Sequence, residues 1–348
     1  MTNKTHADAV LAQKDKGGSH GKKITLREIA ALTGTSVSTV SKALNQSPEI
    51  SENTRRRIIE VARVSHYRAG QQLDIYRDGH QQMIGFLVPD VSNPYFARLW
   101  QGVEDIARTH NYSVVACHTQ EDPDMEIQQL NRIQQLDLAG LLTVPINEAN
   151  YQNLRIPFMF LSRCSATCNT VSYVINNDIQ GGYLATKYLL EQGKRNIYFL
   201  SGPENISVAT NRTHGIRNAY REKDIPFPKN RVLYDNLQFK DGYRAFERIM
   251  KICRPPFGLF CSSDIVAIGA LSAARASGYR IPDDVSIVGY DNIPIDQYMD
   301  YPLTTIAQAD YQIGSHGMKM LAEMISSEEP YRKVNQIMFE PELIVRKT

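Results

Sequence analysis

The sequence contains no uninterrupted hydrophobic run that approaches the roughly 20 residues a helix needs to cross a bilayer. The first residues, MTNKTHADAVLAQKDKGGSHGKK, also lack the apolar centre of a secretory signal peptide. These two absences argue against a membrane protein and against export. We therefore expect a protein without a membrane partner that stays in the cytoplasm, in the same compartment as the nucleoid.

Cysteine is scarce, and its spacing forms no familiar binding motif. The five cysteines are an odd number and include no C-x-x-C pair. This pattern favours neither a disulfide framework nor a zinc site. Cys164 and Cys168 could lie close together, but reduced thiols in or near the core are the simpler interpretation. We expect no metal site and no cofactor.

The motifs of several enzyme classes are also missing. There is no G-x-x-x-x-G-K-[ST] phosphate loop, no G-x-G-x-x-G after a predicted strand and no H-E-x-x-H helix. His118 and His214 are the histidines nearest to predicted ligand-facing strand or helix ends, and surface or capping positions account for both. We predict no catalytic residue, and a sugar- or nucleotide-processing enzyme stays a remote alternative.

The basic charge of the chain is concentrated near one end. Residues 1–68 carry 12 Lys and Arg against 6 Asp and Glu, whereas residues 69–348 carry 27 against 31. The overall charge of +2 conceals this asymmetry. A basic head on a slightly acidic body indicates that the head meets a polyanion.

Residues 25–45, TLREIAALTGTSVSTVSKALN, have the pattern of two short helices joined by a tight turn. Gly34 tolerates the positive φ of such a turn, and Ser36 can cap the second helix. The apolar positions fall at helical spacing on the inner faces, at Leu26, Ile29, Ala30, Val40 and Leu44. The outer face of the second helix is then small and polar.

Residues 51–68, SENTRRRIIEVARVSHYR, can form a third helix. Ile58, Val61 and Ala62 would close a three-helix core. A helical hairpin with a polar second helix is typical of the helix-turn-helix, although a structural pair in a helical bundle has the same periodicity. The third helix and the local basic charge favour DNA binding.

From Met83 onward, short apolar strands alternate with helices of about 10 to 15 residues, which indicates mostly parallel, doubly wound sheets. The chain is long enough for two of them. In such sheets, ligands bind beyond the carboxyl ends of the strands. Polar and aromatic residues follow several of those ends, in the segments 90–96, 262–264 and 290–292. This composition suits a small polyhydroxylated or heterocyclic ligand.

The expected fold is therefore a small all-α helix-turn-helix head joined to an α/β core of two doubly wound parallel-sheet subdomains. We expect a disordered arm at 1–22, the DNA-binding head at 23–68, a hinge linker at 69–82 and the core at 83–348. The first subdomain is predicted to cover about 83–176 and 309–336, and the second about 177–308 and 337–348.

The chain resembles the LacI/GalR family of bacterial transcription regulators over about residues 24–346. The resemblance is carried by the head sequence and by IGFLVPDVSNPYFARLWQGVEDIA, GGYLATKYLLEQGKRNIYFLSGP, IPDDVSIVGYDN and PLTTIAQ. It implies a core that resembles periplasmic sugar-binding proteins. It also implies a dimer, or a dimer of dimers, whose paired heads bind a near-palindromic operator. A solute-binding protein would lack the basic head and would carry an export signal.

The resemblance assigns roles to residues of the head. Val37, Ser38 and Lys42 match base-reading positions, where Lys42 can donate to a guanine and Val37 can pack on a thymine methyl. Other residues match phosphate-holding positions, which set register rather than sequence: Thr25, Ser36, Thr39, Asn45, Ser51 and Thr54.

The hinge departs from the family pattern. Most members have a Pro-Asn pair and, further on, a leucine that wedges into the minor groove at the operator centre; here the corresponding positions read Ala69-Gly70 and Tyr76. Leu73, one helical turn earlier, is an alternative wedge. The predicted hinge contacts are Gln71, Gln72, Leu73 and Tyr76.

The resemblance also implies an effector site in the core. The ring-stacking positions match Tyr95 and Phe96, and Asn93 belongs to the same loop. The arginine of the R-x-x-G motif matches Arg212. The two acidic positions match Asp264 and Asp291, and the crossover position matches Gln308. Ser263, the pair Asn177-Asp178 and Leu237 depart from the common pattern, so the ligand cannot be copied from a relative.

The function implied is a ligand-responsive regulator, a repressor of carbohydrate-utilisation genes whose operator affinity is changed by a small effector. A sugar is expected on family frequency. A nucleoside or purine is the alternative, and the sequence leaves open whether the effector induces or corepresses.

Overall fold

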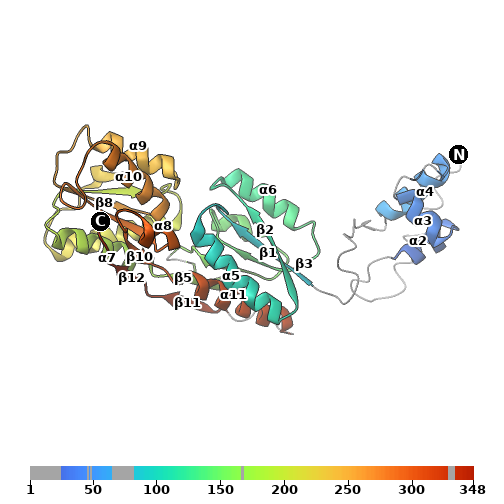
Figure 1. The fold of residues 1–348 in the computed structure, drawn as a ribbon. Helices are drawn as coiled ribbons and strands as arrows, with labels where there is room; N and C mark the ends of the chain where they lie inside the picture. Colours follow the sequence, from blue (N-terminus) through green and yellow to red (C-terminus); the bar gives the residue numbers. More distant parts are fainter. Residues whose placement is uncertain (1–24, 45–46, 48, 65–81, 166–167, 328–333) are drawn as a thin grey trace. The chain divides into compact units, whose positions relative to one another are not determined.

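The computed structural model describes residues 25–44, 47, 49–64, 82–165, 168–327 and 334–348 (Figure 1). The chain divides into a unit of residues 1–80 and a unit of residues 81–348, which we call the head and the core. The predicted arm, the hinge residues 71–76 and Asn45 lie outside the described residues. No helix in the described ranges is both long enough and apolar enough to cross a membrane.

The head contains three described helices, α2 (Leu26–Thr33), α3 (Val37–Leu44) and α4 (Glu52–Val64). Gly34 ends α2 with φ 60°, the left-handed conformation that glycine adopts without strain. Arg57 on α4 donates to the carbonyl of Thr33 at 2.8 Å and so satisfies the end of the first helix. These contacts fix the turn between α2 and α3.

A single apolar cluster holds the three helices together. Its fully buried members come from all three helices, and they are Ile29, Ala30, Val40, Ala43, Ile58 and Ala62. Leu26, Leu44 and Val61 pack against this cluster while partly buried. The predicted helical periodicity is therefore confirmed in each helix, and Ala43 is the one buried member that the pattern did not single out.

The first core sheet has the strand order β11-β5-β4-β3-β1-β2, and all its pairs are parallel. Its strands are β1 (Gln82–Val88), β2 (Tyr112–His118), β3 (Leu138–Thr143), β4 (Phe158–Ser162), β5 (Tyr173–Asn176) and β11 (Gln336–Phe339). Its helical segments are α5 (Pro94–Thr109), α6 (Pro123–Ile133), η2 (Glu148–Tyr151) and α11 (Asp310–Ser326). Separate apolar clusters lie on the two faces, one under α5 and α11 and one under α6. This two-sided burial explains why the inner strands β1 and β3 are almost continuously apolar.

The second core sheet has the order β12-β10-β9-β8-β6-β7. Its strands are β6 (Ile197–Ser201), β7 (Val232–Tyr234), β8 (Phe257–Cys261), β9 (Val285–Asp291), β10 (Thr304–Ala307) and β12 (Glu342–Ile344). Its helical segments are α7 (Asp178–Glu191), α8 (Ser207–Glu222), η3 (Lys229–Arg231), α9 (Phe239–Ile249), α10 (Asp264–Ala276) and η4 (Pro294–Tyr298). Helices α7 and α8 cover one face, and α9 and α10 cover the other.

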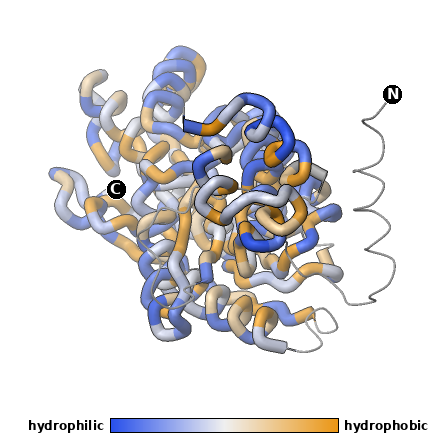
Figure 2. Tube along the Cα trace, turned by 90° about the vertical axis from the view of Figure 1, so that its right-hand side faces the viewer, coloured by the Kyte–Doolittle hydropathy of each residue, from blue (hydrophilic) through white to orange (hydrophobic). Residues whose placement is uncertain are grey.

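The two predicted doubly wound sheets are confirmed, with one antiparallel edge. Strand β12 pairs antiparallel with β10, whereas the other pairs of this sheet are parallel. The last crossing between the sheets falls after Phe339 and not after residue 336, because β11 pairs with β5 of the first sheet. In Figure 2, hydrophobic residues concentrate in the interior of the core, and hydrophilic residues colour its outer helices and turns.

Candidate functional site

A polar pocket of about 390 Å³ lies where the carboxyl ends of strands from both core sheets meet. Six of the seven residues that the sequence predicts for the effector site line it, namely Asn93, Tyr95, Phe96, Arg212, Asp291 and Gln308. The first sheet contributes the segments after β1, β2 and β4, and the second sheet contributes those after β6, β7 and β8, the end of β9 and the segment after β10. The residues that follow the strand ends thus gather around one cavity, as expected for open parallel sheets.

The aromatic wall of the pocket belongs to the first sheet. The side-chain oxygen of Asn93 caps α5 by accepting from the backbone N–H of Tyr95 at 3.0 Å. The rings of Tyr95 and Phe96 meet edge to face, with centroids 5.1 Å apart. Burial raises the pKa of Tyr95 above its usual range, so its hydroxyl stays protonated and donates to Ser162 Oγ at 2.8 Å. These contacts hold the aromatic wall in place without a ligand.

Arg212 on α8 is held by three kinds of contact. Its Nε donates to Asp178 Oδ1 at 2.8 Å, its Nη1 donates to the carbonyl of Ser262, and its guanidinium lies 3.5 Å from the centre of the Tyr290 ring. Burial is the largest single influence and opposes the charge, but Asp178, Tyr290 and Asp291 together outweigh it and raise the pKa of Arg212. Its Nη2 has no protein partner among the described residues and is the nitrogen left for a ligand.

Gly215 explains the R-x-x-G spacing. It lies one helical turn after Arg212 on α8, which packs against α7. A Cβ at Gly215 would come within 1.9 Å of the carbonyl oxygen of Ile179. The missing side chain lets the two helices approach closely enough for Arg212 to reach Asp178 on α7.

Gln308 and Asp291 form the junction between the sheets. The Nε2 of Gln308 donates to Asp291 Oδ1 at 2.6 Å, and the Oε1 of Gln308 accepts from Asn176 Nδ2 at 2.7 Å. Asn176 ends β5 in the first sheet, and Asp291 ends β9 in the second. Burial, together with the charge of Asp264, raises the pKa of Asp291 well above its usual range.

Asp264, the seventh predicted site residue, lies outside the pocket lining. Its side chain is fully buried, with Oδ1 accepting from Thr305 Oγ1 at 2.6 Å and Oδ2 accepting from the backbone N–H of Ile293 at 3.1 Å. A Cβ at Gly289 would touch Oδ1, which shows how closely β9 passes. Asp264 thus joins α10 to the loop after β9 from behind the pocket wall, and the structure does not support its expected direct contact with a ligand.

Glu121 and Arg163 are pocket residues that the sequence interpretation missed. Two hydrogen bonds of 2.8 and 2.7 Å join the guanidinium to the carboxylate, and Arg163 is buried. The two residues follow β2 and β4, so the strand-end rule would have included each of them. Their pairing was not readable, because 42 positions separate them in the chain.

The pocket wall also collects unusual backbone conformations. Gln120, Glu121, Ser162 and Asp291 have φ values of 57°, 57°, 63° and 128°. Each such residue costs on the order of 1 to 3 kcal/mol and persists only where its surroundings enforce the conformation. Their gathering at one cavity is typical of a functional site.

In the head, the predicted base-reading residues lie on the outer surface of α3. Val37, Ser38 and Lys42 are exposed, and Val37 is 40% accessible despite its apolar side chain. Lys42 forms an ion pair with Glu49 across 2.5 Å, which the sequence interpretation did not foresee. The pair must open before Lys42 can contact a base.

Three of the five hydroxyl residues predicted to hold phosphates act as helix caps in the free protein. Thr25 accepts from the backbone N–H of Glu28, Ser36 accepts from that of Thr39, and Ser51 accepts from that of Thr54. Thr25, Ser36 and Ser51 are exposed, whereas Thr39 and Thr54 are half-buried. Capping places these hydroxyls at helix N-termini, where backbone amides favour a phosphate.

Comparisons with known families match both units of the chain. Residues 25–69 match the family described as bacterial regulatory proteins, lacI family. Residues 81–341 match the family described as periplasmic binding proteins and sugar binding domain of LacI family. Together these matches span the described part of the head and nearly all of the core.

Individual relatives match over almost the whole chain. The ribose operon repressor of Halalkalibacterium halodurans is 31% identical over 330 residues, which cover 93% of this chain and 96% of the relative. The transcriptional repressor PurR of Mannheimia succiniciproducens is 28% identical over 329 residues, with coverage of 93% and 98%.

Solved structures show the same architecture. A LacI family regulator from Enterococcus faecium with bound ribose has a TM-score of 0.66 and 27% identity, covering 76% of this chain and 98% of that one. A complex of the regulator CelR with cellobiose has a TM-score of 0.69 at 24% identity, covering 93% and 99%.

Proposed function

The chain belongs to the LacI family of bacterial transcription regulators, and on this premise we propose that its core pocket binds a sugar that controls the affinity of the head for an operator. The expected class, a DNA-binding repressor with an effector domain and not an enzyme, is confirmed by the family matches and by the repressors among its relatives. The ligand and its effect on DNA binding are the proposal.

The distribution of polar groups in the pocket supports a sugar. The second sheet lines the pocket with Arg212 and Asp291, and the first sheet lines it with Asn93 and Asp90, so both walls offer donors and acceptors to a ligand rich in hydroxyls. Charge-assisted hydrogen bonds to hydroxyls and one apolar ring face are the usual means of holding such a ligand. The single observation that carries the proposal is this convergence of Arg212 and Asp291 from different elements on one cavity.

The absence of a second aromatic wall argues against a purine. The second sheet lines the pocket with Val208, Leu237 and polar residues, and none of its described lining residues is aromatic. A flat base gains most from rings on both of its faces. The pocket therefore favours a sugar over a purine. A purine is the alternative that the ligand experiment must exclude.

A ligand between the two sheets supplies a mechanism for regulation. Because the pocket takes residues from both sheets, a bound sugar favours the arrangement in which both walls touch it. In a dimer, a change in that arrangement alters the spacing of the paired heads. A coupling free energy of about 1 to 3 kcal/mol is typical of such links. We propose a cytoplasmic homodimer, with a tetramer as the alternative, on a two-fold operator.

The first experiment identifies the ligand with the purified full-length chain. A thermal-shift panel of pentoses, hexoses, disaccharides, purine bases and nucleosides should show stabilisation by a sugar, about 2.7 kcal/mol at 100 times its Kd. Asp291→Asn should reduce that shift. A shift with purines alone would assign the other ligand class, and sedimentation with and without operator DNA would decide the oligomeric state.

A further inference from the structure

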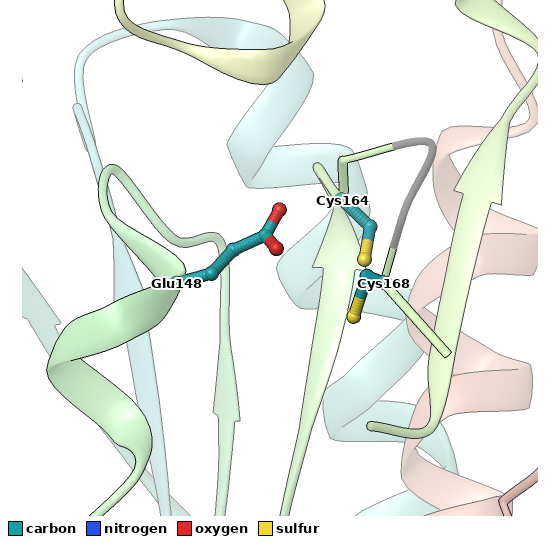
Figure 3. A group of neighbouring side chains, drawn as sticks. All are labelled: Glu148, Cys164 and Cys168. Atoms are coloured by element: carbon teal, nitrogen blue, oxygen red, sulfur yellow. The ribbon is translucent and has the colours of Figure 1, made fainter. Parts of the chain in front are cut away.

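A second group of side chains lies outside the pocket lining, where η2 meets the segment after β4. It consists of Glu148, Cys164 and Cys168 (Figure 3). The potential ligand atoms of these three residues all lie within 4.8 Å of one another. In Figure 3 the carboxylate of Glu148 points toward the two sulfur atoms.

The chemistry of this group suits a thiophilic divalent cation. Two thiolates and a carboxylate are ligands that Zn²⁺ accepts, and a C-x-x-x-C spacing lies within the range that zinc sites use. Cys164 is buried, whereas Cys168 and Glu148 are half-buried. An ion can therefore enter from the surface and leave one coordination position to water.

Without a cation the group is electrostatically unfavourable for thiolates. Burial raises the pKa of Cys164 well above its usual range, and Cys168 and Glu148 raise it further. A bound divalent cation reverses this effect, because coordination stabilises the thiolate form. The arrangement that disfavours an isolated thiolate favours a thiolate–metal complex.

Glu148 is already oriented toward the segment that carries the cysteines. Its carboxylate accepts from the backbone N–H of Ser165 and, at 2.9 Å, from Ser165 Oγ. Each carboxylate oxygen has a second lone pair. One oxygen can thus bind an ion without releasing Ser165.

We propose that Glu148, Cys164 and Cys168 bind one thiophilic divalent cation of the zinc class, with water in the fourth position. The two thiols each release a proton to the buffer, and the cation joins two thiolates and one carboxylate, which leaves a net charge of −1 on the complex. Because two protons leave, the affinity falls by up to about a hundredfold per unit of pH below the pKa of the thiols. The missing C-x-x-C pair had argued against such a site.

The position of the group gives a bound ion access to the pocket. Cys164 directly follows the pocket residue Arg163, and the carbonyl of Cys164 accepts from Asn211 Nδ2 on α8 at 3.4 Å. Asn211 precedes Arg212. A metal ion bound to Cys164 would therefore fix the position of the segment that carries the pocket residue Arg163.

Cobalt titration of the reduced, chelator-treated full-length chain tests the proposal. Co²⁺ should bind at one equivalent, with the charge-transfer absorption of cobalt–thiolate bonds, and Zn²⁺ should displace it. Cys168→Ser and Glu148→Gln should lose affinity. Two control variants should keep the affinity for Co²⁺. Cys117→Ser removes a half-buried thiol elsewhere in the first sheet, and Ser165→Ala keeps all three ligands.

Two results would overturn the site. One is the absence of cobalt–thiolate absorption in the reduced wild-type chain, when free-thiol titration shows that Cys164 and Cys168 are both reduced and available. The other is an undiminished spectrum in Cys168→Ser, with circular dichroism confirming that this variant is folded.

Discussion

Gln308 donates to Asp291 across 2.6 Å while accepting from Asn176 across 2.7 Å, so one side chain joins the two sheets of the core beside the pocket. Both partners are buried, and Asp291 carries a carboxyl whose pKa burial raises. A buried polar group that loses its partner costs about 1 to 3 kcal/mol. The junction therefore favours the arrangement of the sheets that satisfies all three side chains.

Replacing Gln308 by Ala should weaken the link between ligand and operator. Asp291 and Asn176 each lose a partner, so we expect about a tenfold loss in ligand affinity and a smaller change in operator affinity on ligand addition. Calorimetry with the sugar from the panel and fluorescence anisotropy with labelled operator measure the two effects. Gln128→Ala, at an exposed position of α6, is the matched control. Unchanged ligand affinity in Gln308→Ala would remove the junction from the mechanism.

Arg212→Lys should be damaging although it preserves the charge. Lysine cannot reproduce the Nε contact to Asp178, the contact to Ser262 and the stacking on Tyr290 together. Breaking a buried pair typically costs about 3 to 5 kcal/mol, and we expect a loss of stability near the lower end because a cation remains. Urea unfolding and calorimetry check stability and ligand binding. Arg221→Lys, at an exposed position of the same helix, should change neither.

The buried carboxyl of Asp296 should make stability depend on pH. Burial and the charge of Asp264 raise the pKa of Asp296 to about 10. As an ionised carboxylate, Asp296 would have no hydrogen-bond donor to either of its buried oxygens among the described residues. We infer that Asp296 keeps a proton and shares it with Asp264. The pKa of Asp296 is higher in the folded protein than in the unfolded protein, where it is near 4. The contribution of this carboxyl to the free energy of unfolding is therefore complete below about pH 4 and is lost as the pH rises toward 10.

Asp296→Asn should remove most of this pH dependence. One titrating group contributes at most about 1.4 kcal/mol per pH unit. We therefore expect the free energy of unfolding of the wild type to fall between about pH 6 and about pH 8, and that of the variant to fall less. Urea unfolding at the two pH values provides the comparison, with exposed Asp224→Asn as the control. Equal slopes for wild type and Asp296→Asn would show that the proton is not held there.

Lys42→Ala should reduce sequence discrimination by the head. If Lys42 contacts a guanine, its loss costs about 1 to 3 kcal/mol at an operator selected from a random DNA library and much less on random DNA. Anisotropy titrations at one fixed salt concentration measure both affinities. An equal loss on both DNAs would make Lys42 a phosphate contact.

Glu49→Gln provides the complementary variant. It releases Lys42 from its ion pair and removes a negative charge from the surface near α3. We expect tighter binding to operator and to random DNA alike, because the added attraction to phosphates is independent of sequence. Weaker operator binding would instead show that Glu49 orients Lys42 for its base.

The sequence alone determined the features that depend on neighbours along the chain. Helical spacing placed Ile29, Val40 and Ile58 in the core of the head, and β/α alternation indicated two doubly wound sheets. Strand ends identified the segments that carry Asn93 and Asp291. The predictions of the head core and of the two sheets succeed because periodicity and capping are local properties of the chain.

The tertiary structure decided which side chains meet. Asp264 lies behind the pocket wall, and Glu121 pairs with Arg163. Lys42 pairs with Glu49. Glu148 lies beside Cys164 and Cys168. These pairs depend on sheet order, on helix packing and on the turns between elements, none of which has a local signature. A strand end shows where a ligand can bind, but only packing determines whether a given carboxylate faces the pocket or the core.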